Sequence, residues 1–424
     1  MRLLISAYSC RPCKTSEPGN AWRIINYVLS QGHEVWAVIE QSEYQKETLE
    51  HLANHPMPGF HPVFFQLPTL LVKSLRGAGM SHAVYYHLWQ HKLLQVAAQL
   101  HRQVGFDLTH HITFGRYWSP SGVRNLGIPF VWGPVGAAES APPSFVSELP
   151  LRERWFELVR DNVRALATRD PALRDTARAA TIGLGVTRES CAALRKLGVR
   201  RVEQLPQITL SDEELTLFDS FPLPAERPFR AICMGRLLHW KGFHLAIRAF
   251  AIFARNNPDA ELWFVFNEGP FQRELEKTAA RAGIASRVRF FGHLPSYSEV
   301  MAKLAQAHVL MHPGLHEPFG QVCIEALAAG RPVICLDIGG PASQVTPETG
   351  FVAPATTPAE AVASMAAFLT RIAGDRALLV SMSAKARARA REKFSMRSMG
   401  SAISTFYRQA AELHAPAALR TIGG

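Results

Sequence analysis

The sequence lacks any apolar run approaching the ~20 residues that a helix needs to cross a bilayer. Its opening residues are too few for the apolar region of a secretory signal peptide, so a cytoplasmic location is the default expectation. Several common motifs are also missing: G-x-x-x-x-G-K-[ST], G-x-G-x-x-G, H-E-x-x-H and D-x-D. The chain therefore shows none of the best-known phosphate, dinucleotide or metal signatures.

Cysteine is scarce, with six in 424 residues. Four stand alone in apolar surroundings, which predicts buried thiols in a reducing compartment. Cys10 and Cys13 form a C-x-x-C, but no second pair with metal-ligand spacing accompanies them, so no structural zinc site is predicted. A redox pair following the first strand stays an alternative.

The composition indicates a folded, basic protein. Apolar residues make up 47% and charged residues 19%, which provides for large cores and excludes disorder for most of the chain. The length predicts about two or three domains. The net charge of +11 admits nucleic acid, an anionic membrane or phosphorylated substrates as partners, and charge alone does not choose among them.

Apolar patterning predicts two α/β domains. Near the start, a strand over 3–7, a helix over 21–29 and a strand over 33–39 form a βαβ unit. Residues 206–230, rich in proline and partly acidic, are the best linker candidate, and a second alternation of strands and helices follows. The predicted fold class is α/β, with doubly wound sheets that bind ligands at the carboxyl ends of their strands and a central cleft between the domains.

Two cations mark the turn after the first strand of the second half. The stretch is Gly235-Arg236-Leu237-Leu238-His239-Trp240-Lys241-Gly242. A strand-to-helix turn brings cations and free backbone N–H groups close to an anion, and a diphosphate leaving group needs that stabilisation. A surface turn with two solvated cations is the alternative.

A second cluster begins at His316-Glu317-Pro318-Phe319-Gly320-Gln321 and continues to Glu325. The helix is expected to begin near Gly320, so its N–H groups face the preceding loop. Glu325, in an apolar stretch, needs a partner, and a ribose diol would supply two hydroxyl donors. The alternative is that Glu325 complements the helix dipole or pairs with an arginine.

Together these stretches resemble the retaining GT-B glycosyltransferases of family 4, also called glycosyl transferases group 1. The matching patterns are G-R-L-x3-K-G, E-P-F-G within E-x7-E, and E-A-x-A-x-G-x-P-V-I. Further similar stretches follow in order, among them Ser16-Glu17-Pro18-Gly19, Asn267-Glu268-Gly269-Pro270 and Gly339-Gly340-Pro341. The resemblance implies two Rossmann-like domains, residues 1–205 for the acceptor and 206–397 for the donor, with a C-terminal helix over about 398–424 packing back on the first.

The resemblance also implies residue roles. Arg236 and Lys241 would hold the donor diphosphate, Glu317 would contact the transferred sugar, and Glu325 would accept the ribose hydroxyls. Other implied donor contacts are Gly19, Asn267, Leu294, Phe319, Gly320 and Gln321. Such enzymes need no metal and no protein nucleophile, because the leaving phosphate helps to deprotonate the acceptor.

The catalytic histidine implied by the family is His110, at the end of a strand. The family commonly has a second histidine two positions later, where this chain has Ile112, with His111 in between. His110, His111 or neither could therefore serve, and a core histidine is the alternative. Ten of the 17 histidines fall between residues 33 and 111, and without metal-ligand spacing they predict no metal site.

We therefore predict a retaining, metal-independent hexosyltransferase that moves a sugar from a nucleotide-sugar donor to a saccharide or lipid-linked acceptor, in cell-surface or exported polysaccharide synthesis. No nucleic acid partner is expected. An aromatic and basic stretch over 60–92 is consistent with contact to the inner face of the cytoplasmic membrane, or with core. Alternatives are a nucleotide-sugar epimerase or sugar phosphorylase of the same fold, or a non-catalytic basic binding protein.

Overall fold

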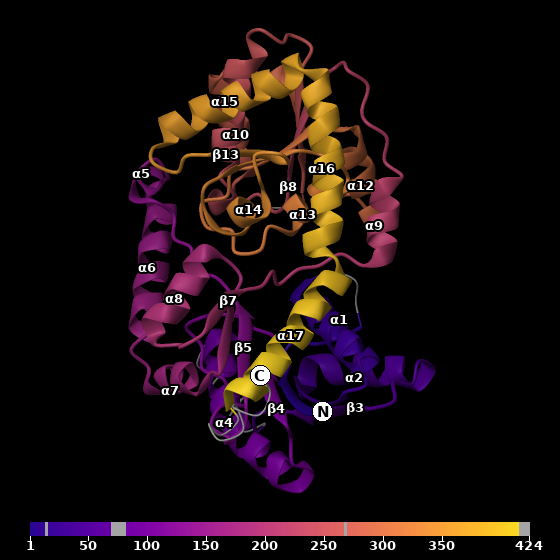
Figure 1. Cartoon of the computed structure of the whole chain (residues 1–424). Coiled ribbons are helices and arrows are strands. Elements are labelled where there is room, and N and C mark those ends of the chain that lie inside the picture. Colours follow the sequence, from indigo (N-terminus) through magenta and orange to yellow (C-terminus); the bar gives the residue numbers. More distant parts are fainter. Residues whose placement is uncertain (13–15, 69–81, 267–268, 415–424) are drawn as a thin grey trace. The chain divides into compact units, whose positions relative to one another are not determined.

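The computed structural model describes residues 1–12, 16–68, 82–266 and 269–414 (Figure 1). These form two compact units. The first comprises residues 1–138, 162–208 and the C-terminal segment from 396, and the second comprises residues 139–161 and 209–395. No helix among the described residues has the length and apolar character needed to cross a membrane.

The first unit is built on a seven-stranded parallel sheet in the order β3-β2-β1-β4-β5-β6-β7. The strands are β1 (Arg2–Ser6), β2 (Glu34–Glu40), β3 (Phe60–Phe65), β4 (Leu108–His111), β5 (Phe130–Val135), β6 (Ile182–Gly185) and β7 (Val202–Gln204). Its helices are α1 (Ser16–Ser30), α2 (Gln41–Asn54), α4 (His82–Val104), α7 (Pro171–Ala179), α8 (Arg188–Leu197) and α17 (Met396–His414).

Alternation along these strands produces a core on each face of the sheet. Along β1, Leu3 and Ile5 join the core that also contains Met399 and Ile403 of α17. Leu4 points to the other face, where Trp89 of α4 lies fully buried. Successive strand residues point to opposite faces, so a sheet covered on both faces needs strands that are apolar throughout.

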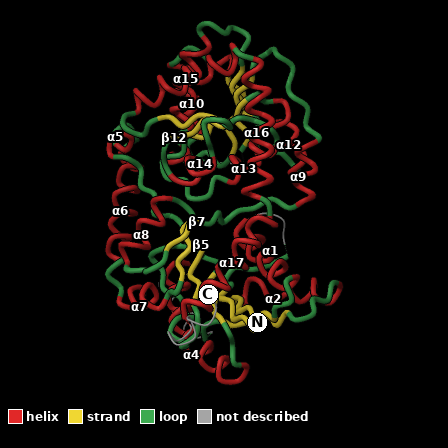
Figure 2. The backbone as a smooth tube through the Cα atoms, in the orientation of Figure 1, coloured by secondary structure: helices red, strands yellow, loops and turns green. Residues whose placement is uncertain are grey.

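The second unit is built on a six-stranded parallel sheet in the order β10-β9-β8-β11-β12-β13. Strands are drawn in yellow in Figure 2, where β12 is labelled in this unit. The strands are β8 (Arg230–Met234), β9 (Glu261–Val265), β10 (Val288–Phe290), β11 (Val309–His312), β12 (Val333–Leu336) and β13 (Gly350–Ala353). Its helices are α5 (Pro143–Val146), α9 (Asp212–Asp219), α10 (Phe243–Ala254), α11 (Gln272–Arg281), α12 (Tyr297–Gln306), α13 (Gln321–Ala328), α14 (Gly339–Gln344), α15 (Pro358–Gly374) and α16 (Arg376–Phe394), with short 3-10 helices η1 (His239–Lys241) and η2 (Ala285–Arg287). Helix α6 (Leu151–Ala167) begins in the second unit and ends in the first.

The observed division differs from the predicted one at residues 139–161. This segment lies inside the predicted first domain, yet Phe145 and Leu149 are buried in the core that also contains Phe243 and Phe250 of α10. Apolar spacing shows that a segment is buried but not in which of two cores. The proposed linker also contains a helix, α9, whose N-terminus is closed by a capping box between Ser211 and Glu214.

Four aromatic residues of the stretch over 60–92 belong to the core of the first unit. Phe60 lies in β3, and Tyr85, Tyr86 and Trp89 of α4 are at most 6% exposed. Residues 69–81, with Leu70, Leu71, Lys73 and Arg76, lie outside the described residues. The membrane interpretation is therefore wrong for these four aromatic side chains, because their rings fill the interior of the first unit.

Candidate donor site

The predicted donor residues gather at the point where the strand order of the second sheet reverses. Strands β8 and β11 are parallel neighbours, and the chain leaves them in opposite directions along the sheet. In open α/β sheets such a switch point is where ligands bind. The loop after β8 carries Arg236 and Lys241, and the loop after β11 carries Glu317.

The two loops are in direct contact. The backbone N–H of Leu315 donates to the carbonyl of Trp240 at 2.7 Å. Gly242 has a φ of +66°, and a Cβ there would overlap the carbonyl oxygen of Pro313. Only glycine meets both demands, the left-handed backbone and the close approach. The final glycine of G-R-L-x3-K-G is thus required by the packing of one loop on the other.

Lys241 and Glu317 form an ion pair across these loops. Their side chains are 16% and 12% exposed. His312, fully buried at the end of β11, places its Nε2 3.5 Å from Glu317 Oε2. Burial alone would raise the pKa of Glu317, but Lys241 and His312 hold that pKa well below its usual range. Glu317 is therefore an anion at neutral pH, fixed to a cation.

The start of α13 holds the next group of predicted residues. Gly320, with φ +60°, precedes the helix, and its N–H lies 3.4 Å from Glu317 Oε1. Phe319 is half-buried, and its carbonyl accepts from the side chain of Gln344. Unpaired N–H groups at a helix start and the helix dipole both favour an anion.

Glu325 is buried one turn further along α13. Its Oε1 accepts from Gln321 Nε2 at 2.9 Å and from Tyr297 Oη at 3.1 Å. Burial raises the pKa of Glu325 to about 7, and these two hydrogen bonds only partly oppose the rise. No arginine or lysine neutralises this carboxyl in any contact of the described residues. A group that donates to it would stabilise its charged form.

The other residues predicted to bind the donor lie in separate places. Arg236 is exposed, and its side chain makes no hydrogen bond or ion pair within the described part of the chain. Leu294 is half-buried between β10 and α12, three residues before Tyr297. Gly19 lies in α1 of the first unit. Asn267 lies outside the described residues.

The sequence analysis did not identify Glu157, which is hydrogen-bonded to both loops. Its Oε1 accepts from His239 Nε2 at 2.7 Å and from His316 Nε2 at 3.0 Å. Burial opposes ionisation, yet the two histidines lower the pKa of Glu157 to about 2. His239 is two residues before Lys241, and His316 directly precedes Glu317. Glu157 therefore holds in place the segments that carry the ion pair.

Replacing Glu157 by alanine should lower both stability and turnover. Two buried imidazole N–H groups would lose their acceptor, at a cost of about 1–3 kcal/mol each. Both loops would lose this common acceptor and move, and Lys241 and Glu317 would move with them. We therefore expect kcat to fall about tenfold or more. Denaturant unfolding and steady-state rates would measure these effects. The control is Glu148→Ala, which removes an exposed pair with Arg248 and should change neither; equal behaviour of the two variants would contradict the role.

The first unit has its own switch point, between β1 and β4. Glu17 lies there: its Oε1 accepts from the N–H of Gly115 at 3.0 Å and from Gln207 Nε2 at 3.1 Å. Burial raises the pKa of Glu17, although the hydrogen bonds lower it in part. Because of this position at the switch point, Glu17 is, besides Glu157, a candidate for mutagenesis.

Neither His110 nor His111 is open to a ligand. His110 Nε2 lies 2.7 Å from the carbonyl oxygen of Gly133, so that nitrogen carries the proton and donates. Its Nδ1 then accepts from Tyr407 Oη at 2.7 Å. His111 Nδ1 lies 3.1 Å from Ser121 Oγ. Both rings are at most 1% exposed, and these contacts favour the structural alternative over the implied catalytic role.

Tyr407→Phe should therefore destabilise the protein without slowing transfer per folded molecule. The variant leaves His110 Nδ1 buried without a donor, which costs about 1–3 kcal/mol. Denaturant unfolding would measure the loss, and the rate would be normalised to folded protein. A large fall in rate with unchanged stability would instead assign His110 to the chemistry.

Comparison with known proteins identifies the class. Residues 218–393 match the family described as glycosyl transferases group 1. The chain is 28% identical over 313 residues to a 2-deoxystreptamine glucosyltransferase of Streptomyces kanamyceticus, covering 68% of this chain and 74% of that protein. It is 30% identical over 185 residues to the lipopolysaccharide core biosynthesis mannosyltransferase LpsB of Rhizobium meliloti, covering 41% and 50%. The solved structure of Anabaena HepE in complex with UDP superposes with a TM-score of 0.59 at 19% identity, covering 96% of this chain and all of that one.

The two doubly wound parallel sheets and these structural neighbours define a GT-B fold. The match to glycosyl transferases group 1 lies within the second unit, and together with the GT-B fold it supports a glycosyltransferase.

Proposed function

We propose that this enzyme moves a sugar from a nucleotide-sugar donor to a hydroxyl of a saccharide or lipid-linked saccharide, with retention and without a metal, as in family 4. The observation that carries the proposal is the group formed by the Lys241–Glu317 pair, the open cation Arg236 and the start of α13. This group offers positive charge to a diphosphate and an anion to sugar hydroxyls within one unit.

Each residue has a distinct task in the proposed reaction. Arg236 and Lys241 neutralise the leaving diphosphate as the bond between the anomeric carbon and the phosphate oxygen breaks. Glu317 stays ionised and accepts from hydroxyls of the transferred sugar. Its low pKa makes it a poor base, so the acceptor proton passes to the leaving phosphate while the acceptor oxygen bonds to the anomeric carbon. Glu325 accepts from the ribose hydroxyls.

Two relatives support the proposed donor and acceptor classes. HepE was solved with UDP, which makes UDP the first nucleotide to test. LpsB is named for lipopolysaccharide core biosynthesis, which supports a cell-surface or exported saccharide as acceptor. The reaction would then take place in the cytoplasm, and at the inner face of the membrane when the acceptor is lipid-linked.

The first experiment is thermal unfolding with UDP, GDP, ADP and dTDP at millimolar concentration. A ligand that binds only the folded state raises the Tm by mass action. One nucleotide should raise it, and Arg236→Gln should reduce that rise. The matching nucleotide-sugar would then be tested for a new glycosidic bond, with the anomeric configuration read by NMR. Epimerised donor or a sugar phosphate as product would favour the alternative enzymes, and no shift with any nucleotide would favour a binding protein.

A further inference from the structure

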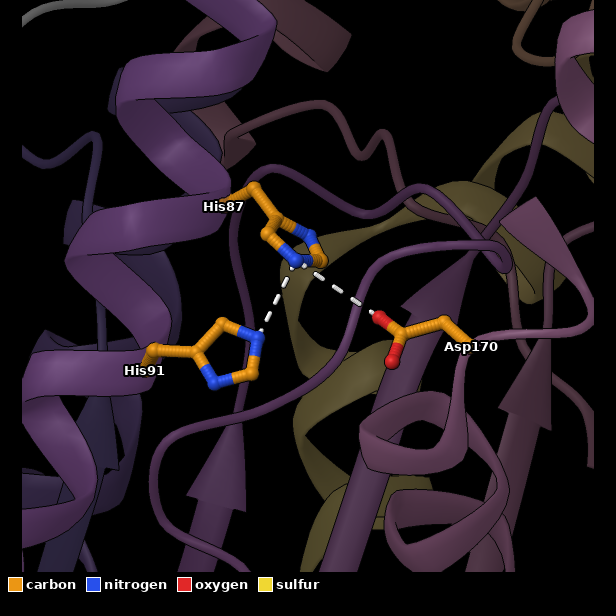
Figure 3. A group of neighbouring side chains, drawn as sticks. All are labelled: His87, His91 and Asp170. Atoms are coloured by element: carbon orange, nitrogen blue, oxygen red, sulfur yellow. Dashed lines mark hydrogen bonds and ion pairs between the residues drawn. The ribbon is translucent and has the colours of Figure 1, made fainter.

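A side-chain group in the first unit has the composition of a metal site. His87 and His91 lie one turn apart on α4, and Asp170 precedes α7 (Figure 3). The two Nε2 atoms are 3.0 Å apart, and His87 Nε2 is 3.6 Å from Asp170 Oδ2. Ligands bound at 2.0–2.1 Å in a tetrahedron lie roughly 3.3 Å apart, so these separations bracket the required value.

One carboxylate oxygen of Asp170 is available to bind an ion. Asp170 Oδ1 accepts from the N–H of Ala172 at 2.9 Å and so caps α7. Asp170 Oδ2 is buried and has no hydrogen-bond partner among the described residues. A buried carboxylate oxygen without a hydrogen bond is costly, and a cation would remove that cost.

We propose that His87, His91 and Asp170 bind a divalent ion of the zinc class, with water in the fourth position. Two imidazoles and a carboxylate suit Zn²⁺, Ni²⁺ or Cu²⁺ rather than Mg²⁺. The ion would join α4 to the start of α7 within the first unit. It lies outside the residues proposed for transfer, so its role is structural.

The test uses the untagged full chain without nucleotide. Zn²⁺ should bind one per chain and raise the Tm by a few degrees, Mg²⁺ should not, and bound Co²⁺ should show visible absorption of a tetrahedral site. His91→Ala and Asp170→Asn should weaken Zn²⁺ binding at least tenfold, although asparagine keeps the helix cap. The control is His55→Ala, because His51 and His55 also lie four apart and stack at 4.6 Å but belong to no such three-residue group in the described chain. Absence of stoichiometric Zn²⁺ binding, or equal binding by the three variants, would overturn the site.

Helix α6 carries an independent feature, an apolar stripe that faces solvent. The stripe consists of Leu151, Trp155, Val159, Val163 and Leu166. These side chains are 54–72% exposed, and their spacing places them on one face of the helix. A surface helix ordinarily buries its apolar face, whereas α6 exposes this one.

The opposite, charged face of α6 makes the hydrogen bonds to other parts of the protein. Glu157 accepts from His239 and His316, and Arg160 donates to the carbonyl of Glu139 at 2.8 Å. Arg164 donates to the carbonyl of Ala138 at 3.1 Å. These contacts fix the rotation of α6 about its axis, so the apolar stripe stays on the side that faces solvent.

We infer that the stripe of α6 docks on an anionic lipid surface. Exposed arginines stand near both ends of the helix: Arg152 in its first turn and Arg169 two residues beyond its last. Apolar side chains that enter the acyl boundary, flanked by cations that meet lipid headgroups, are the composition of an interfacial helix. A second copy of this chain fits less well, since self-pairing would bring the arginines of both copies together in a protein of net charge +11. The inference deepens the proposed function, because a lipid-linked acceptor would be met at that surface.

The test is flotation with vesicles containing about 30% phosphatidylglycerol, with neither donor nor acceptor, so it can fail separately from the transfer reaction. Wild type should float with anionic vesicles at low salt and much less with pure phosphatidylcholine. Val159→Glu with Val163→Glu should cut binding at least tenfold, while the control Val380→Glu, an exposed valine of α16, should not. The inference would be overturned if the stripe variant bound vesicles as well as wild type, or if wild type did not bind. It would also be overturned if wild type formed a dimer without lipid and the stripe variant did not.

Discussion

Lys241→Ala and Glu317→Ala should each lower kcat by at least 100-fold. Each removes a charge that, in the proposed reaction, contacts the diphosphate or the sugar as the bond breaks, and loss of one such group typically costs a factor of 100 to 1,000. Each should also destabilise the protein by about 3–5 kcal/mol, because the remaining partner is a buried charge without its counter-ion. Steady-state rates and denaturant unfolding would measure the two effects on the same samples.

The double variant Lys241→Ala/Glu317→Ala separates these effects. With both charges gone, no unpaired charge remains, so its stability should be higher than that of either single variant. Its activity should stay low, since both contacts are absent. Lys385→Ala is the matched control, removing an exposed lysine that pairs with Glu348 at 2.9 Å. Near-normal turnover in both single variants would contradict the assignment of the donor site.

Glu325→Gln should make the protein more stable at pH 8 and a weaker binder of its donor. The raised pKa means that the folded protein holds a proton between pH 4.5 and about 7, where the unfolded chain has lost it. The unfolded state therefore binds fewer protons, and stability falls as pH rises through that range. The accumulated loss at pH 8 is about 3 kcal/mol at most, and glutamine avoids it while its oxygen still accepts from Gln321 and Tyr297.

The cost of Glu325→Gln should appear in donor affinity. Ribose hydroxyls donate to the ionised carboxyl, so wild-type affinity should rise from pH 6 to pH 8, with proton release on binding. The variant should bind 10- to 100-fold more weakly at pH 8 and lose that pH dependence. Calorimetric titration at several pH values would measure both. A variant that gains stability but binds with wild-type affinity would show that Glu325 is structural, and Glu348→Gln is the exposed control.

Much of the fold could be predicted because buried strands in a parallel sheet are short and apolar throughout. Strands were expected over 3–7 and 33–39, and the structure has β1 over Arg2–Ser6 and β2 over Glu34–Glu40. Strand β3 was missed, since its sequence, FHPVFF, contains a histidine and a proline. Proline is tolerated there because β3 is an edge strand.

The site was predictable only where residue types lie close in sequence. Arg236, Lys241, Glu317 and Glu325 stand within two short motifs, and their chemistry is visible from type and spacing. Glu157 was invisible, because in sequence it is one acid in an arginine-rich helix, and its partners lie about 80 and 160 residues away. The partner of His110 lies 297 residues away, so no local pattern distinguishes a satisfied core histidine from a reactive one.

The chain passes between its two units four times, at 138/139, 161/162, 208/209 and 395/396. No single cut can therefore separate them. A hybrid enzyme that borrows the proposed donor site of this protein must take residues 139–161 together with 209–395. Without residues 139–161, the borrowed unit would lack both Phe145 in its core and the Glu157 carboxylate that bonds to the loops carrying Lys241 and Glu317. Modularity in this protein is thus a property of the folded units and not of contiguous stretches of gene.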